Sequence, residues 1–396
     1  MSDFERTLRE TLGHAAGNAP RLGGMAADRL ETGYRRRRRR LRAAVATAAV
    51  VAVAGGGVVG LRVGDGTRAA SLRSPTGDPS AAVTVPRPSA RPIEQVWPQA
   101  VVRIPLKDRG RNLRPVTLVD DRTLLVTAER EVDHATALYT YDLTDRKLRK
   151  IAEVPEPKGT ERFASDLSVG DGQVAWWTAT KDRTHIWAAS SDGAGARLVA
   201  DQDGEGFDGF GVANGSVVFS PMDGGVFTVP LTGGRATRIA AGDGQYLLSW
   251  PWAGSPGTGE SDKPPFTRLV NLETGQVSQA VVHEGERVYA CGVRFCIGTT
   301  NGGWPFTRLR DGSRQKYVPV GYQDPAPPSQ DRFHLCDVGK DGPGIGICDV
   351  DTGTVVDLGL GEDVANGAVS TTDRSGRIMS YRVKGESYVV ILSRIP

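Results

Sequence analysis

A recurring hairpin constrains the fold of this chain more than any other feature of its 396 residues. Each copy is a strand-like run, a polar turn and a second run, as in VFTVPLTGGRATRIA at 226–240. The turns centre on Asp145, Gly193, Gly233, Gly275, Gly312 and Gly353, which lie 48, 40, 42, 37 and 41 residues apart. A period of about 40–45 residues with four strands per repeat is typical of β-propeller blades. The sequence therefore predicts an all-β propeller over 97–396.

The number of blades follows from counting the repeats. Another strand pair lies upstream of each hairpin, for example at 115–129 and 166–180. Six hairpins and a last strand pair at 367–396 make seven units of about 43 residues. The last unit lacks an outermost strand, and AVVRIPL at 100–106 is a spare strand that would close the ring and hide two edges. We predict seven blades, with six as the alternative because the fifth unit is irregular.

An apolar run behind a block of arginines indicates a membrane segment. No charge occurs in the 19 residues from 43 to 61, a length that spans a hydrocarbon core as a helix. Positive charge beside a span stays on the cytoplasmic side. We therefore predict a cytoplasmic basic tail at 1–42, a transmembrane signal anchor at 43–62 and an outer region beyond it. The residues that set this topology are Arg35, Arg36, Arg37, Arg38, Arg39 and Arg40.

Two other interpretations of the apolar run remain open. An Ala-rich helix could be buried in a soluble domain, although six arginines beside it are difficult to place in a core. A cleaved signal peptide is the second, although a 42-residue leading segment is unusually long for one. The residues at 63–96 are rich in Pro, Ser and Gly, which predicts a disordered linker under either interpretation of the apolar run.

The net charge of +3 is unevenly distributed along the chain. Residues 1–42 hold 11 arginines against 5 acidic residues, a net charge of +6, so the remainder carries −3. A nucleic-acid-binding domain would carry a basic face. The large outer region is mildly acidic, so nucleic acid is not expected as its main partner.

The four cysteines all lie in the predicted propeller: Cys291, Cys296, Cys336 and Cys348. An even number in a chain facing an oxidising compartment favours two disulfides. Cys336 and Cys348 flank a hairpin whose turn centres near Gly342, which would set them opposite each other on adjacent strands, and Cys291 and Cys296 would close a tight bridge. Zinc is the competing interpretation, but the spacings between the cysteines are not the usual ones and no histidine pairs with them at ligand spacing. Buried free thiols are the third.

The sequence assigns no catalytic residue, cofactor or metal. Its five histidines are scattered, and the motifs of α/β-hydrolases, P-loop proteins and dinucleotide-binding proteins are absent. Propeller glycosidases use carboxylates near the central channel, where Asp166, Asp208 and Asp373 would lie at the start of inner strands. Most aspartates are better explained as turn residues. The adjacent Trp176 and Trp177 would point to opposite faces of a strand, with at least one packed between blades.

The sequence of 97–396 resembles bacterial TolB-type, WD-repeat-like β-propellers. The most typical stretch is IWAASSDGAGARLVAD at 186–201, an apolar strand and a DG turn before an R-L strand. The layout of tail, arginine block, apolar span, linker and propeller also resembles a group of membrane-anchored bacterial propellers. No blade ends in the Trp-Asp dipeptide of true WD repeats. The resemblance implies a fold and a tendency to bind proteins, and it implies no activity.

These observations lead to one functional hypothesis and two alternatives. We expect a single-pass protein of the cell membrane, anchored through 43–62, whose outer propeller binds a protein, a peptide or an envelope polysaccharide without catalysing a reaction. The first alternative is an extracytoplasmic hydrolase or lyase that uses channel carboxylates. The second is a transmembrane sensor whose tail holds a cytoplasmic regulator.

Overall fold

The computed structural model describes residues 90–108, 110–131, 134–255, 266–317, 328–338, 344–360, 369–370, 376–383 and 385–396. The predicted tail with Arg35–Arg40, the predicted anchor at 43–62 and most of the predicted linker lie outside these residues. Within the described residues, no helix is both long and apolar enough to cross a bilayer. The account below therefore concerns the C-terminal unit.

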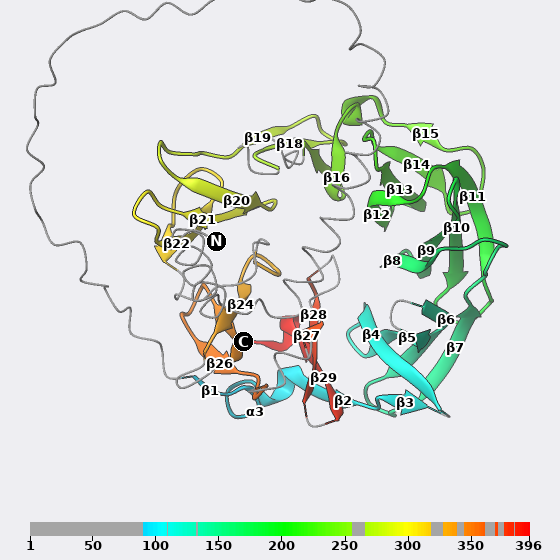
Figure 1. The fold of residues 1–396 in the computed structure, drawn as a ribbon, viewed down its shortest axis with the longest axis horizontal. Coiled ribbons are helices and arrows are strands. Elements are labelled where there is room, and N and C mark those ends of the chain that lie inside the picture. The colour runs from blue at the N-terminus through cyan, green and yellow to red at the C-terminus, as the bar shows by residue number, and fades with distance from the viewer. Residues whose placement is uncertain are drawn as a thin grey trace, which may run out of the picture. The chain divides into compact units, whose positions relative to one another are not determined.

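Almost every described element is a β-strand, and the sheets follow one another around a ring (Figure 1). Three successive four-stranded sheets are antiparallel meanders in chain order. The first has β12 (Phe207–Ala213), β13 (Ser216–Pro221), β14 (Phe227–Pro230) and β15 (Thr237–Arg238). The second has β16 (Tyr246–Ser249), β17 (Trp252–Gly254), β18 (Arg268–Asn271) and β19 (Val277–Gln279). The third has β20 (Arg287–Cys291), β21 (Phe295–Thr299), β22 (Pro305–Leu309) and β23 (Lys316–Tyr317).

Two further four-stranded sheets each take one strand from the N-terminal end of the described chain. In one, β24 (Phe333–Asp337), β25 (Ile345–Asp349) and β26 (Val355–Asp357) are joined by β1 (Arg91–Pro92), which runs parallel to β26. In the other, here called the closing sheet, β27 (Val369–Ser370), β28 (Ile378–Val383) and β29 (Glu386–Ile391) are joined by β2 (Val101–Ile104). The antiparallel pairing of β2 with β29 confirms the predicted ring closure by 100–106.

The remaining nine strands form one continuous sheet. They are β3 (Lys107–Asp108), β4 (Arg111–Asp120), β5 (Thr123–Glu131), β6 (His134–Asp142), β7 (Leu148–Glu153), β8 (Arg162–Gly170), β9 (Gln173–Ala179), β10 (Arg183–Ser190) and β11 (Arg197–Asp203). Strands β4–β7 and β8–β11 are each antiparallel meanders. A parallel pairing of β6 with β8, at His134 and Phe163, joins the two.

The predicted count of separate blades is therefore wrong. Five sheets are independent four-stranded blades, and a nine-stranded sheet stands where the seven-bladed prediction requires two more separate ones. The physical reason is the contact between His134 and Phe163, whose rings stack with centroids 3.7 Å apart. Their backbones come close enough there to pair across the gap that separates other blades.

The fold begins before the predicted boundary at residue 97. Helix α3 (Ile93–Val96) and the 3₁₀ turn η1 (Pro98–Ala100) connect β1 to β2. Ile93 is fully buried and Trp97 packs edge-on against Phe333. The last residues of the predicted linker, 90–96, are thus part of the propeller. Two other 3₁₀ turns, η2 (Ala240–Gly242) and η4 (Leu392–Arg394), complete the described elements.

The turn glycines that define the repeat adopt the backbone conformation that favours glycine. Gly193, Gly233 and Gly312 have φ of 101°, 100° and 86°. The first hairpin has Asp145 at this point of the pattern, and there Arg146 takes the positive φ, 57°. The repeat period seen in the sequence is thus the spacing of one turn per blade.

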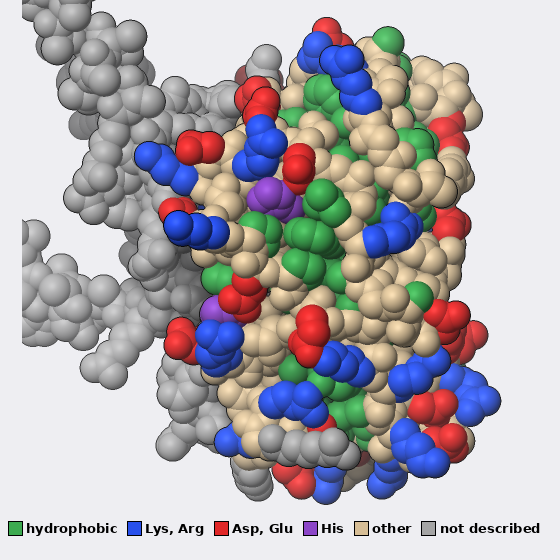
Figure 2. Space-filling view, turned by 90° about the vertical axis from the view of Figure 1, so that its right-hand side faces the viewer, with side chains coloured by type: hydrophobic (Ala, Val, Ile, Leu, Met, Phe, Trp, Pro, Cys, Tyr) green, Lys and Arg blue, Asp and Glu red, His purple; other side chains and the backbone are tan. Residues whose placement is uncertain are grey.

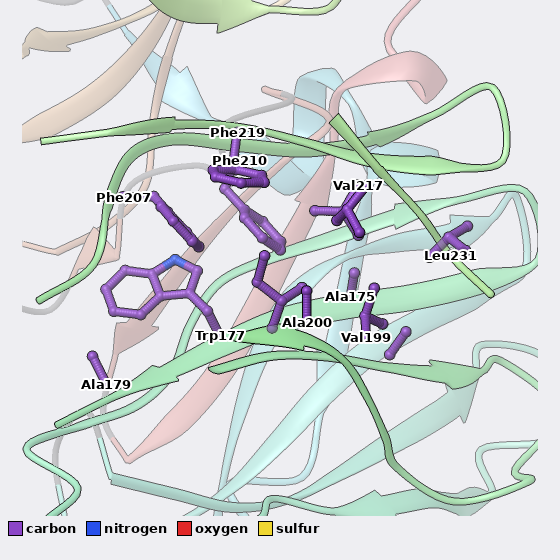
Figure 3. Packing of buried hydrophobic residues seen from close by; sticks show 13 residues of the cluster. Ala175, Trp177, Ala179, Val199, Ala200, Phe207, Phe210, Val217, Phe219 and Leu231 are labelled. Atoms are coloured by element: carbon purple, nitrogen blue, oxygen red, sulfur yellow. The ribbon is translucent and has the colours of Figure 1, made fainter. Parts of the chain in front are cut away.

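The core lies between neighbouring blades, where the alternating apolar side chains of facing strands meet. One large cluster joins β9, β10 and β11 to β12, β13 and β14 (Figure 3). Within it, Phe207 lies edge-on to Trp177 at 5.8 Å and beside Phe219 at 4.5 Å between ring centroids. Trp176 faces the other way, into the cluster that includes Leu125 and Ile151. Both tryptophans are buried, as the alternation of the strand predicts.

Candidate binding surfaces

The cysteines form the two predicted disulfides, Cys291–Cys296 and Cys336–Cys348. Cys291 and Cys296 are directly opposite each other on β20 and β21, with Cα atoms 4.0 Å apart. Cys336 lies opposite Gly346 rather than Cys348, so this bridge is diagonal and its Cα atoms are 6.0 Å apart. The expectation of adjacent strands is confirmed, and that of directly opposed cysteines is wrong by two residues.

The candidate channel carboxylates are only partly within the described residues. Asp166 lies on β8 at a positive φ of 49°, and its Oδ2 accepts a hydrogen bond from Trp177 Nε1 at 3.1 Å. Asp208 is half-buried on β12. Asp373 lies outside the described residues. The three-carboxylate site expected of a hydrolase therefore stays a prediction.

Two of the histidines pair with carboxylates of neighbouring residues in the fold. His134 Nε2 is 3.1 Å from Glu156 Oε1, and His185 Nδ1 is 2.6 Å from Asp201 Oδ1. The part of the chain that the structure describes contains no group of three or more side chains arranged to hold a metal ion. On the face seen in Figure 2, basic and acidic side chains alternate, with small groups of hydrophobic side chains between them.

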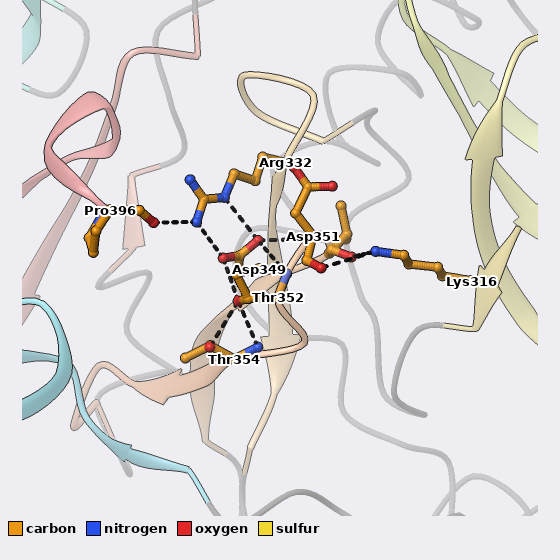
Figure 4. Close-up of polar contacts among 8 residues, drawn as sticks. Lys316, Arg332, Asp349, Asp351, Thr352, Thr354 and Pro396 are labelled. Carbon is orange, nitrogen blue, oxygen red and sulfur yellow. Dashed lines mark hydrogen bonds and ion pairs between the residues drawn. The ribbon is translucent and has the colours of Figure 1, made fainter. Parts of the chain in front are cut away.

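Basic side chains link successive blades through backbone carbonyls. From the outermost strand β7, Arg149 donates to the carbonyls of Ser191 and Asp192 at 3.2 and 3.1 Å, in the turn before β11. Arg197 of β11 donates in the same way to the carbonyl of Leu231. Lys316 of β23 donates to the carbonyls of Val350 and, at 3.2 Å, Asp351 (Figure 4). The R-L strand of the repeat thus contributes to holding one blade against the next.

An ion pair ties the C-terminus to the β24–β26 sheet. Arg332 donates to both oxygens of Asp349, at 3.0 and 2.7 Å, and to the carbonyl of Pro396 at 2.6 Å (Figure 4). Burial raises the pKa of Asp349, but Arg332 and the hydroxyl and amide of Thr352 outweigh it, so the pKa lies below its usual value. This side chain is ionised and fully engaged at neutral pH.

Two buried arginines join β22 to the segment that follows β19. Arg308 is fully buried and pairs with Glu286, with N–O distances of 2.8 and 2.6 Å, and it also donates to the carbonyl of Val281 at 2.9 Å. Arg310 donates to Ser278 Oγ and to four backbone carbonyls, at 2.7 to 3.0 Å. Burial lowers the pKa of Arg310 to about 10, so it remains charged at neutral pH.

The segment fixed by these arginines carries exposed apolar side chains. The described residues include five large exposed hydrophobic side chains, and four of them lie on β19, on β23 or in the loop between β19 and β20. We call these four the apolar rim surface: Val277 (51% exposed), Val281 (37%), Val282 (46%) and Tyr317 (65%). The amide of Val281 donates to the carbonyl of Arg310 at 2.7 Å, which fixes the backbone of this surface to the neighbouring blade. The fifth, Leu198, is on β11.

A cavity of about 630 Å³ lies where the closing sheet meets the nine-stranded sheet. We call it the seam cavity. Its lining comes from Arg103–Leu106 at and after the end of β2, from Tyr141 and Arg146 at the end of β6 and its turn, and from Gly385–Glu386 at the start of β29. These segments are far apart in the sequence, so no local pattern indicated this site. The one local signal was Arg146, a side chain at a turn position where most repeats have glycine.

No family model and no curated protein matches this chain. Solved structures with similar folds include YCF48 from Cyanidioschyzon merolae (TM-score 0.43, 10% identity, 74% of this chain and 99% of that chain). The WD40 β-propeller domain of Doa1 has a TM-score of 0.39 at 10% identity, over 73% and 95% of the two chains. A puromycin hydrolase has a TM-score of 0.40 at 12% identity, over 65% and 48%. Similarities at this level carry no argument about binding or activity, and the propeller fold rests on the sheet topology.

Proposed function

We propose that this chain is a protein-binding propeller that docks its partner on the apolar rim surface. The observation that carries the proposal is that four of the five exposed large hydrophobic side chains of the described residues lie on two neighbouring blades or on the loop that joins them. Exposed hydrophobic residues are common singly, whereas grouped ones mark interaction sites. Arg308 and Arg310 hold the backbone beneath this group, so the surface is rigid before a partner arrives.

Photo-crosslinking at the most exposed residue of this surface tests the proposal. Tyr317 is replaced by a photoreactive phenylalanine analogue in the full chain, and the same replacement is made at Leu198 as the matched control. Both positions are exposed and lie on outermost strands, but Leu198 is on a different sheet. We expect a discrete cross-linked protein from position 317 that is absent from position 198. Equal labelling from both positions, or none from 317, would contradict the proposal.

A second part of the proposal concerns where the propeller is located and which group of propellers it belongs to. We propose that 43–62 anchors the propeller outside the cell membrane with its tail inside, as in the membrane-anchored TolB-type propellers that the sequence resembles. The two disulfides support this location because such bonds persist in oxidising compartments. Fusions after residue 96 to alkaline phosphatase and to a cytoplasm-dependent fluorescent protein test it. Phosphatase activity without fluorescence is expected, and the reverse would refute the topology.

A further inference from the structure

The seam cavity is lined by a buried tyrosine whose accessible hydroxyl has no partner among the described residues. Tyr141 is only 3% exposed, lines the cavity, and its hydroxyl makes no hydrogen bond to any described residue. Burial raises the pKa of Tyr141, so the hydroxyl keeps its proton and acts as a donor at neutral pH. Buried polar groups are normally hydrogen-bonded. Tyr141 therefore offers a hydrogen bond to an acceptor that enters the cavity.

The mouth of the cavity carries an arginine without a carboxylate partner. Arg146 is exposed and forms no ion pair with any residue that the structure describes. The carboxylate in the same turn, that of Asp142, is already engaged: it accepts the amides of Thr144 and Asp145 at 2.7 and 2.9 Å and lies 3.6 Å from Arg122. Arg146 is thus available to an external anion.

The remaining lining residues are balanced in charge and include apolar side chains. Arg103 pairs with Glu386 at 2.9 Å, and Tyr388 donates to the same carboxylate at 2.7 Å. The carboxylate of Glu386 is therefore neutralised by Arg103, and the net positive charge of the cavity lining comes from Arg146. Ile104, Pro105 and Leu106 supply apolar lining next to these polar groups.

We propose that the seam cavity binds a carboxylate-bearing side chain of an extended peptide. The carboxylate would accept hydrogen bonds from Tyr141 and Arg146, and its apolar neighbours in the peptide would contact Ile104–Leu106. A volume of about 630 Å³ suits such a ligand. The site lies on other sheets than the apolar rim surface, so either site can fail without the other.

Calorimetric titration of the full chain with two blocked peptides tests this site. The probe is an acetylated and amidated hexapeptide of alternating leucine and glutamate, and its control has glutamine in place of each glutamate. We expect saturable binding of the glutamate peptide and about tenfold weaker binding of the glutamine peptide, since hydrogen bonds to a charged group are the stronger ones. No binding, or equal binding of both peptides, would overturn the proposal.

Variants then locate the binding site. Arg146→Gln should weaken binding of the glutamate peptide about tenfold, and Tyr141→Phe severalfold, because each removes one donor. Arg314→Gln is the matched control: Arg314 is an exposed arginine at positive φ (52°) in the turn before β23, away from the cavity. It should bind as the unmodified chain does. Unchanged affinity in Arg146→Gln, or an equal loss in Arg314→Gln, would place the peptide elsewhere and refute the site.

Discussion

The side chain of Arg310 fixes several backbone segments through hydrogen bonds. Its guanidinium donates to carbonyls of Phe266, Thr267, Ser278 and Gly292, which belong to two blades, and no carboxylate lies among these partners. Arg308 lies two residues earlier, on β22, and pairs with Glu286 instead. The sequence FTRLR shows both arginines on one face of a strand, but their partners lie up to 44 residues away, so burial could not be inferred from the pattern.

Replacing Arg310 should therefore destabilise the fold strongly. In Arg310→Met the aliphatic part of the side chain keeps its packing, but four backbone carbonyls lose their hydrogen-bond donor. We therefore expect the free energy of unfolding to fall by about 3 kcal/mol. Urea unfolding followed by tryptophan fluorescence measures it. Arg314→Met, at an exposed turn, serves as the control and should change stability by less than about 0.5 kcal/mol. Equal losses would show that the hydrogen bonds of Arg310 are unimportant.

The pKa of Asp349 predicts how stability depends on pH. Because its folded-state pKa is depressed, the ion pair with Arg332 stabilises the fold above the unfolded pKa of about 3.9 and loses this effect as pH falls through the folded value. The free energy of unfolding should therefore fall with acidification below about pH 4. In Asp349→Asn this fall should be shallower, measured by chemical unfolding at a series of pH values. An identical slope in both proteins would contradict this role.

At the scale of elements, the sequence predicted the hairpins well because each rests on local chemistry. The turn glycines at positive φ and the alternating apolar residues lie within 15 residues of each other. The pairing of the strand at 100–106 was also predicted, because the last repeat lacks an outermost strand and this strand can take its place. Pairing of β1 with β26 was not, because two exposed residues, Arg91 and Pro92, carry no strand pattern.

The disulfide cysteines are part of the buried core of their blades. The cluster of the β20–β23 sheet has five buried residues, two of which are Cys291 and Cys296. Replacing each pair by serine should lower the free energy of unfolding by about 2 kcal/mol for Cys291–Cys296 and about 3 for Cys336–Cys348, because the second closes a longer loop (separations of 5 and 12). Urea titration of the two double variants checks both the loss and its order. No loss in either would show that the bridges do not stabilise the fold.

The N-terminal strands should be essential for a closed ring. A chain lacking residues 1–89 keeps β1, α3 and β2, whereas one lacking 1–106 loses them together with the buried Ile93, Trp97 and Ile104. We expect the shorter truncation to unfold cooperatively, and the longer one to lose at least about 5 kcal/mol. Calorimetric melting compares the two. Matching transitions would mean that the closing strand contributes little.

At the scale of the whole molecule, the propeller followed from the repeat period, but the separation between blades did not. One stacking contact, His134 on Phe163, merges two meanders into a nine-stranded sheet, and no sequence rule links residues 29 positions apart in this way. The binding surfaces were missed for the same reason. The apolar rim surface and the seam cavity are each assembled from blades that meet only in the folded ring.

The central claim is that the apolar rim surface recruits a protein partner. The most direct test is quantitative affinity purification of the full chain from solubilised membranes, comparing the unmodified chain with the triple variant Val277→Ser, Val282→Ser, Tyr317→Ser. Leu198→Ser controls for the loss of an exposed apolar side chain elsewhere. We expect one or more proteins to be retained by the unmodified chain and by Leu198→Ser and lost from the triple variant. Retention of the same proteins by all three would contradict the claim.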